Sequence, residues 1–213
     1  VFSVFARANQ IVAGTAINLM AAGLTPFFCK VLYDVTGSTP ALEAAERLEL
    51  SPFVGAWAAL ALVQLAYSGL DAGLKIRFAG EHPEALDASG ASVRAWRLGA
   101  VTLSGVLAAL GGATLSIGLS SSFSRGMTAG RGFMALAAVI FGKWRPVPTV
   151  VACLLFGFFD AVQMRLQGAS IGAVPVPVQF IQILPYVVTV AVLAGFVGTA
   201  RPPRALGLPF RKG

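Results

Sequence analysis

Charged side chains are scarce in this sequence. Asp, Glu, Lys and Arg make up only 12% of the 213 residues, while 56% are hydrophobic, and the mean hydropathy is +0.78. Soluble globular domains carry roughly 25% charged residues. A chain this poor in charge has too little polar surface to cover a water-soluble fold of its size, so the shortage argues against the soluble globular classes.

Histidine and cysteine are scarce as well. His82 is the single histidine, and it lies beside Glu81 and Pro83 in a hydrophilic stretch, so no Ser/His/Asp arrangement can be built around it. Cys29 and Cys153 both fall within apolar segments and have no metal-ligand spacing. We therefore predict that the chain is not an enzyme and has no disulfide framework and no metal or cofactor of its own.

Nucleotide-binding and secretory signals are also missing. The glycine-rich stretch GVLAALGGA at residues 105–113 is not followed by GK[ST], which a phosphate-binding loop requires. Its small residues suit close helix packing instead. The opening VFSVFARANQ has neither an initiator Met nor a small-residue cleavage site after its apolar stretch, and it fits a fragment whose upstream part is missing.

Long uncharged runs are what the chain does have. Residues 52–70, 98–119 and 168–200 contain no charged side chain, and about 20 helical residues are enough to cross a hydrocarbon core of about 30 Å. The runs are continuously apolar and lack the alternation of barrel strands. The sequence therefore predicts an all-α membrane protein.

The runs predict a polytopic bundle of transmembrane helices. Residues 133–142 and 147–159 are too short to span a bilayer alone, and the basic turn KWRP separates them, so they are expected to form a short or interrupted hairpin. With this hairpin the sequence gives about six crossings in a single transmembrane domain over residues 1–213, at residues 9–33, 51–70, 98–119, 133–142, 147–159 and 178–200.

The net charge of +7 has a topological explanation, because the basic residues sit at the ends of apolar runs and form no face for nucleic acid. If the hydrophilic segment 71–97 is cytoplasmic, most of the 16 Lys and Arg residues lie inside, as the positive-inside rule favours. The basic residues left outside are then Lys30, Arg47, Arg125, Arg131 and Arg165.

The longest hydrophilic segment, residues 71–97, reads DAGLKIRFAGEHPEALDASGASVRAWR. Within it, residues 84–97 are predicted to form a short amphipathic helix. Pro83 precedes this helix where proline suits a helix start, and Glu84 and Asp87 occupy early turns where the helix dipole favours acids.

Gly90 lies inside the predicted amphipathic helix and would allow a bend or the close approach of a partner. Arg94 and Arg97 give the helix a basic end at the membrane surface. Two interpretations remain open: the segment merely joins two spans, or it lies parallel to the membrane and docks into a groove on a cytoplasmic partner.

The segment from residue 126 to 167 is predicted to fold back on itself near residues 143–146. Arg131 and Asp160 would then lie at similar depth, within about two residues or 3 Å of axial rise. An ionisable residue within a membrane is by default a functional hypothesis that needs a partner. One hypothesis is that Arg131 and Asp160 pair within the membrane; the other, which stays open, is that both lie in the wet headgroup region.

Uncharged amide side chains inside the predicted spans are candidates for a substrate path, because amides both donate to and accept from sugar hydroxyls. The alternative for each is a hydrogen bond between helices. The candidates named from the sequence are Asn9, Gln10, Asn18, Gln163, Gln179 and Gln182, among which Asn18, Gln163 and Gln182 are chosen for the path.

Several ordered strings carry a family resemblance: ANQIVAGTAINLMAAGLT near the start, RFAGEHPEALDASG in the hydrophilic segment, then GMTAGRGFMALAAVIFGKWRP and LLFGFFDAVQMRLQ. They resemble the permease subunits of ABC importers for ribose, nucleosides and branched-chain amino acids, and are most similar to the nucleoside and simple-sugar branch. Such permeases usually carry further spans before the ANQIVAGTAIN stretch, and residues 50–74 are compressed here to a single crossing.

The resemblance implies that residues 84–90 lie in a coupling helix that seats in an ATPase subunit, with Glu84, Ala85, Asp87, Gly90 and Arg94 as the coupling residues. It also implies a cytoplasmic ABC ATPase that uses ATP and Mg, a second permease subunit and an extracytoplasmic substrate-binding protein, at the bacterial inner membrane. ATPase closure would push on residues 84–97 and tilt the attached spans. The alternatives are a branched-chain amino acid permease, a non-transporting membrane scaffold and a self-sufficient secondary carrier.

Overall fold

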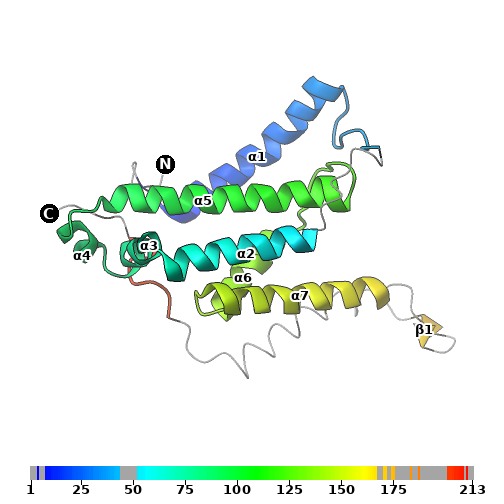
Figure 1. Cartoon of the computed structure of the whole chain (residues 1–213). Helices are drawn as coiled ribbons and strands as arrows, with labels where there is room; N and C mark the ends of the chain where they lie inside the picture. The colour runs from blue at the N-terminus through cyan, green and yellow to red at the C-terminus, as the bar shows by residue number, and fades with distance from the viewer. Residues whose placement is uncertain are drawn as a thin grey trace. The chain divides into compact units, whose positions relative to one another are not determined.

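The computed structural model describes residues 4, 8–43, 52–166, 170–171, 174–175, 183, 187, 201–208 and 210. The chain divides into two compact units, Val1–Ala129 with Pro203–Gly213, and Gly130–Pro202. Most of the described residues in both units are helical (Figure 1). The only strands among the described residues are the two-residue pair β1 (Ser170–Ile171) and β2 (Val174–Pro175).

The first unit contains two long apolar helices. α1 (Gln10–Tyr33) begins at Asn9, whose Oδ1 accepts hydrogen bonds from the N–H groups of Ile11 (2.9 Å) and Val12 (3.5 Å). α5 (Val93–Ala113) continues without a break into the π-helix η2 (Thr114–Leu119). The spans predicted at 9–33 and 98–119 are thus present, although the second begins five residues earlier than the apolar run suggests.

The rest of the first unit is α2 (Pro52–Gly69), α3 (Asp71–Glu81) and α4 (Pro83–Ala88). α2 and α3 meet at an angle of 79°, so that α3 is seen end-on beside α2 in Figure 1. The bend requires Gly73, because a Cβ there would collide with the carbonyl oxygen of Ala66. The helical character of residues 71–81 was not predicted, since this stretch has neither an apolar run nor a strong cap.

The loops after α1 and after η2 are joined by backbone hydrogen bonds. Ser38 and Ser124 form an isolated antiparallel bridge, and the N–H of Thr39 donates to the carbonyl of Phe123 at 2.9 Å. The Thr39 hydroxyl accepts a hydrogen bond from the N–H of Phe123 in return. These contacts hold the far ends of α1 and of the α5–η2 helix close to each other.

The second unit contains a helical hairpin of α6 (Arg131–Phe141) and α7 (Pro146–Leu166). The turn between them contains Lys143 and Trp144, both with positive φ, at the predicted place. Gly142 has no room for a side chain, because a Cβ there would collide with Thr149. Across the hairpin, the Phe141 and Phe156 rings meet edge to face at 5.4 Å.

One expectation for the hairpin is wrong. Its second arm was expected to end near residue 159 and to be too short to span, but α7 continues through Asp160 and Arg165 to 21 residues. A charged residue near the end of a helix does not break its backbone hydrogen bonds, so the loss of hydropathy marks the end of the apolar run but not of the helix. α6, with 11 residues or about 16 Å, remains too short to cross alone.

Three described helices are long and apolar enough to cross a membrane, Gln10–Tyr33, Val93–Leu119 and Pro146–Leu166, and a fourth is reached if the bent pair α2–α3 counts as one span. The predicted last span, 178–200, lies outside the described residues except at 183 and 187. The chain is therefore a multi-pass helical membrane protein with three or four candidate spans in the described part.

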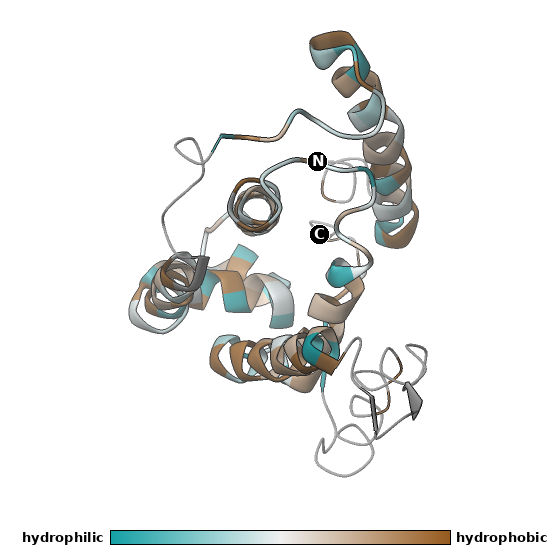
Figure 2. Cartoon of the chain, turned by 90° about the vertical axis from the view of Figure 1, so that its right-hand side faces the viewer, coloured by the Kyte–Doolittle hydropathy of each residue, from teal (hydrophilic) through white to brown (hydrophobic). Residues whose placement is uncertain are grey.

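Most of the large apolar side chains are exposed on the surface of the helices. Within the described residues only six hydrophobic side chains are buried, while large ones such as Ile11, Leu62 and Phe133 are at least two-thirds exposed. Figure 2 shows hydrophobic residues along most turns of the helices. Helices exposed in this way can satisfy all their backbone groups internally and place their side chains in lipid or against other helices.

Candidate functional site

The predicted coupling helix is not a single helix. Residues 84–97 were expected to form one amphipathic helix, but α4 ends at Ala88 and α5 starts at Val93. The expectation is wrong because the residues between them, 89–92, carry strong stop and start signals. α4 therefore stands as a separate six-residue helix between α3 and α5.

α4 begins as its sequence predicts. His82 is both the C-cap of α3 and the N-cap of α4. Its carbonyl accepts a hydrogen bond from the N–H of Ala85 at 3.1 Å. Pro83 occupies the first turn, where its missing N–H costs nothing, and Glu84 follows where the positive end of the helix dipole favours an acid.

α4 ends in a Schellman motif centred on Gly90. The N–H of Ala91 donates to the carbonyl of Leu86 at 3.3 Å, and the N–H of Gly90 to the carbonyl of Asp87 at 2.9 Å. Gly90 has a φ of +81°, which L-residues with a side chain rarely adopt. Of the two possibilities that the sequence left open for Gly90, a bend and the close approach of a partner, the structure shows the bend. Ser92 then starts α5 by accepting the N–H of Ala95 on its hydroxyl at 3.4 Å.

α4 rests on a small buried cluster. Ala79 from α3, Leu86 from α4 and Val93 from α5 are each less than 5% exposed and pack together, with Ala91, Trp96 and Phe210 around them. Lys75 Nζ lies 5.5 Å from the centroid of the Trp96 ring, within range of a cation–π contact. This cluster fixes α4 to the helices on either side of it.

The residues predicted to couple the chain to an ATPase lie on the surface of α4 and of the chain that follows it, and not in the buried cluster. Glu84, Ala85, Gly90 and Arg94 are exposed, and Asp87 is half-buried. A hollow of about 330 Å³ lies beside them, lined by Asp87, Gly90, Ala91, Ser92, Val93, Arg94 and Phe210. α4 therefore presents one buried side chain, Leu86, to the fold and a polar surface to the outside.

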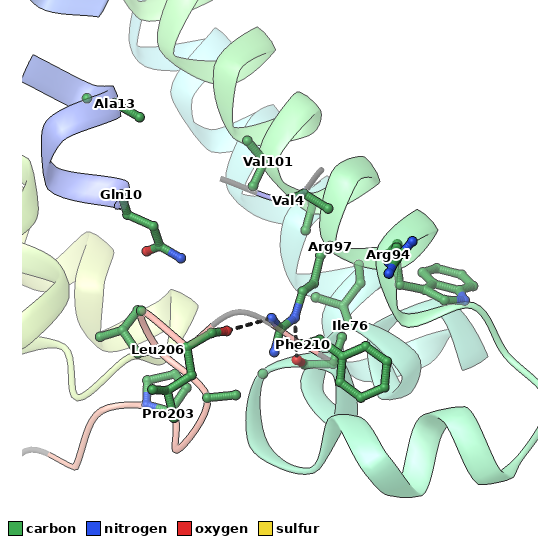
Figure 3. A pocket seen from close by; sticks show the side chains of 18 of the residues that line it. Val4, Gln10, Ala13, Ile76, Arg94, Arg97, Val101, Pro203, Leu206 and Phe210 are labelled. Carbon is green, nitrogen blue, oxygen red and sulfur yellow. Dashed lines mark hydrogen bonds between the residues drawn. The ribbon is translucent and has the colours of Figure 1, made fainter. Parts of the chain in front are cut away.

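Sequence reasoning missed the part played by residues 203–210. Arg97 donates from Nε to the carbonyl of Ala79 at 3.1 Å and from Nη1 to the carbonyl of Leu208 at 2.9 Å (Figure 3). The N–H of Ala205 donates to the carbonyl of Gly80 at 2.9 Å. A cavity of about 480 Å³ adjoins these contacts, with lining residues from α1, α3, α5 and residues 203–210. A separation of 111 positions between Arg97 and Leu208 leaves no local signal to find.

The hairpin carries the predicted ion pair. Arg131 Nη2 lies 3.7 Å from Asp160 Oδ2, and the two side chains are 45% and 32% exposed. A hollow of about 190 Å³ next to them is lined by Arg131, Met134, Ala135, Cys153, Phe156, Gly157 and Asp160. The structure thus brings the two charges together at the open end of the hairpin, beside an apolar hollow.

The polar residues predicted for the substrate path are spread over both units. Asn18 is exposed on α1 and Gln163 is half-buried on α7, while Gln182 lies outside the described residues. Asn9 is a helix cap. Gln64 on α2 was missed, although its Oε1 is buried and has no hydrogen-bond partner within the described part of the chain.

Sequence comparisons place the chain among known transporters. A family model described as the permease component of the branched-chain amino acid transport system matches residues 1–193. A nucleoside ABC transporter permease protein of Lactococcus lactis is 38% identical over 97% of this chain and 70% of its own length. A guanosine ABC transporter permease protein of Bacillus subtilis is 32% identical, also over 97% and 70%.

A putative glucose ABC transporter permease protein of the archaeon Haloferax volcanii is 33% identical over 88% of this chain and 67% of its own length. No solved structure matches the chain. The family match covers both units, from α1 through the hairpin and beyond, and it agrees with the exposed apolar helices. The chain belongs to the family of permease components typified by the branched-chain amino acid transport system.

Proposed function

We propose that the chain is the membrane-spanning permease subunit of an ABC importer for nucleosides in the bacterial cytoplasmic membrane. The observation that carries the proposal is α4, a short helix with an exposed acidic start that is fixed by a buried cluster between two candidate spans. Two relatives over 30% identical, whose names include nucleoside or guanosine transport, support the substrate class.

In the proposed assembly α4 docks into a groove on a cytoplasmic ABC ATPase. Glu84, Ala85, Gly90 and Arg94 form the exposed contact surface, and Asp87 forms the wall of the adjoining hollow. The ATPase binds and hydrolyses ATP with Mg, and this chain supplies no catalytic group. A second permease subunit completes the path, and an extracytoplasmic binding protein delivers the nucleoside.

The proposed mechanism follows from how α4 is attached. α3 joins it to α2 through the bend at Gly73, and the Schellman motif joins it to α5. A push on α4 is therefore transmitted to α2 and α5 as rigid bodies, which is the kind of motion that alternating access needs.

The test is transport by the reconstituted complex. The chain is co-expressed with its ATPase, purified, placed in liposomes with the binding protein, and assayed for uptake of radiolabelled guanosine. We expect uptake only with ATP and Mg, and loss of ATPase co-purification when Glu84 is changed to Lys. Guanosine uptake without ATP or any partner would instead make the chain a secondary carrier.

A simple sugar is the second candidate substrate, because a relative 33% identical is named a putative glucose permease. A branched-chain amino acid is the third, from the description of the family model. Competition of labelled guanosine uptake by excess glucose or leucine separates these substrates. A stable complex that hydrolyses ATP but moves none of the three would favour a scaffold role.

A further inference from the structure

The end of α3 is capped from outside the helix. The last carbonyls of an α-helix have no intrahelical donor and need other partners. The Phe78 carbonyl accepts the N–H of His82, as usual for a helix end. The next two carbonyls are met by distant groups: that of Ala79 by Arg97 Nε at 3.1 Å and that of Gly80 by the N–H of Ala205 at 2.9 Å.

Arg97 makes a second link between the end of α3 and the segment near the end of the chain, in addition to the hydrogen bond from Ala205 to Gly80. While Nε bonds α3, Nη1 of the same guanidinium donates to the carbonyl of Leu208 at 2.9 Å. Guanidinium is planar and presents its donors in a fixed fork, so both carbonyls are held in one geometry. A lysine at this position would offer only a single flexible charged group.

Residues 203–210 also contribute to the core below α4. Phe210 packs against the buried cluster of Ala79, Leu86 and Val93, and it lines the hollow beside Asp87 and Gly90. Pro203 lies against α3. Its Cβ is 3.7 Å from the point that a Cβ on Gly80 would occupy. The segment therefore contacts α3 and the base of α4 at separate points.

We propose that Arg97 forms a brace with four residues near the end of the chain, Pro203, Ala205, Leu208 and Phe210, and that this brace caps α3 and holds α4 in the orientation in which it meets the ATPase. Arg97 is a positioning residue: it acts through α3 and the segment and is itself only partly exposed. This inference rests on the proposed function. Loss of the brace leaves the spans in place and loosens the link between ATP hydrolysis and transport.

The first experiment compares Arg97→Ala with Arg204→Ala in the reconstituted complex. Arg204 is exposed and lies in the same segment, but its side chain makes none of the contacts of the brace described above, so its loss removes an equal charge and leaves those contacts in place. We expect Arg97→Ala to lower the ratio of nucleoside taken up to ATP hydrolysed by at least about tenfold, because the side chain makes two charge-assisted hydrogen bonds and the loss of one alone corresponds to about that factor. We expect Arg204→Ala to leave the ratio unchanged.

The second experiment replaces the brace with a covalent bond. In a background of Cys29→Ala and Cys153→Ala, the pair Gly80→Cys and Pro203→Cys places two Cβ atoms about 3.7 Å apart, within the 3.5–4.5 Å of natural disulfides. Added to Arg97→Ala, the oxidised pair should restore the coupling ratio, and reduction with dithiothreitol should abolish the gain.

The outcomes separate the brace from the proposed function. An unaltered coupling ratio in Arg97→Ala, or a pair that forms no disulfide in membranes, would overturn the brace. An oxidised pair that fails to restore Arg97→Ala would also overturn it. Absence of any ATP-dependent uptake by the unaltered chain would overturn the proposed function instead, and disulfide formation would still test the geometry.

Discussion

Arg131 Nη2 and Asp160 Oδ2 lie 3.7 Å apart across the α6–α7 hairpin. Arg131 is the first residue of α6, and Asp160 lies near the end of α7, so the pair joins the two arms at the end opposite their turn. The turn is fixed by Gly142 and the Phe141–Phe156 contact. The hairpin is thus held at both ends, by packing at one and by charge at the other.

Changing either charged residue of the hairpin alone should destabilise the protein. Arg131→Leu or Asp160→Leu removes one member of the ion pair, at a cost of up to roughly 3 kcal/mol if the remaining charge faces hydrocarbon and less if water reaches it. The double change Arg131→Leu with Asp160→Leu should recover most of the loss. Thermal unfolding in detergent, with the yield of membrane-inserted protein, measures the effect.

A double variant that is as unstable as the worse single variant would contradict this pairing. Gln163→Leu, one turn along the same helix, serves as the control for a polar side chain changed on α7 without breaking the ion pair.

The hairpin was predictable because its signals are local. Two apolar runs, a basic turn and two opposite charges at matching distances from it were enough to place Arg131 opposite Asp160. The length of α7 was not predictable in the same way, because the hydropathy drops at Asp160 while the helix continues to Leu166. Hydropathy shows which residues can face lipid, but it does not show where a helix ends, because the end of a helix depends on its capping residues.

Gly90 should tolerate only residues that accept a left-handed backbone. At its φ of +81°, a residue with a Cβ costs roughly 1–2 kcal/mol, so Gly90→Val should open the Schellman motif and weaken ATPase binding. Gly90→Asn should bind nearly as well, because asparagine tolerates this region better. Co-purification of the ATPase in a detergent titration measures the difference. Equal loss in both variants would assign Gly90 a contact role and not a backbone role.

Gly73→Ala should disrupt the bend between α2 and α3. The added Cβ would collide with the carbonyl oxygen of Ala66, which belongs to the preceding helix and cannot move as a side chain could. We expect a loss of about 1–3 kcal/mol from overpacking and a reduced yield of folded protein. Gly99→Ala on α5 is the matched control, since nothing lies within 4 Å of its Cβ. Similar yields from the two variants would argue against the bend.

The coupling region was only half predictable. Pro83, Glu84 and Gly90 are strong local signals, and they fixed where α4 begins and where the chain bends. α3 and the contacts of Arg97 were not visible, because the first depends on packing against α5 and the second on a segment 111 positions away. One sequence contains no record of such long-range pairs.

Gln64 is expected to cost stability where it stands. Its Oε1 is buried on α2 without a hydrogen-bond partner among the described residues, and an unmet buried polar group costs about 1–3 kcal/mol. Gln64→Leu should therefore raise the midpoint of thermal unfolding or leave it unchanged. Gln163→Leu, on the half-buried face of α7, is the comparison. A lower midpoint for Gln64→Leu would mean that the amide has a stabilising partner.

The orientation of the chain follows from the basic residues and can be tested by cysteine labelling. α4 should face the cytoplasm and the loop after η2 the outside, because this arrangement puts most Lys and Arg inside. Ala88→Cys on α4 and Thr128→Cys in that loop are exposed positions, to be made without Cys29 and Cys153. A membrane-impermeant maleimide should label position 128 in intact spheroplasts and position 88 only in inverted vesicles. Labelling of position 88 in intact spheroplasts would place α4 outside, where no ATPase could reach it.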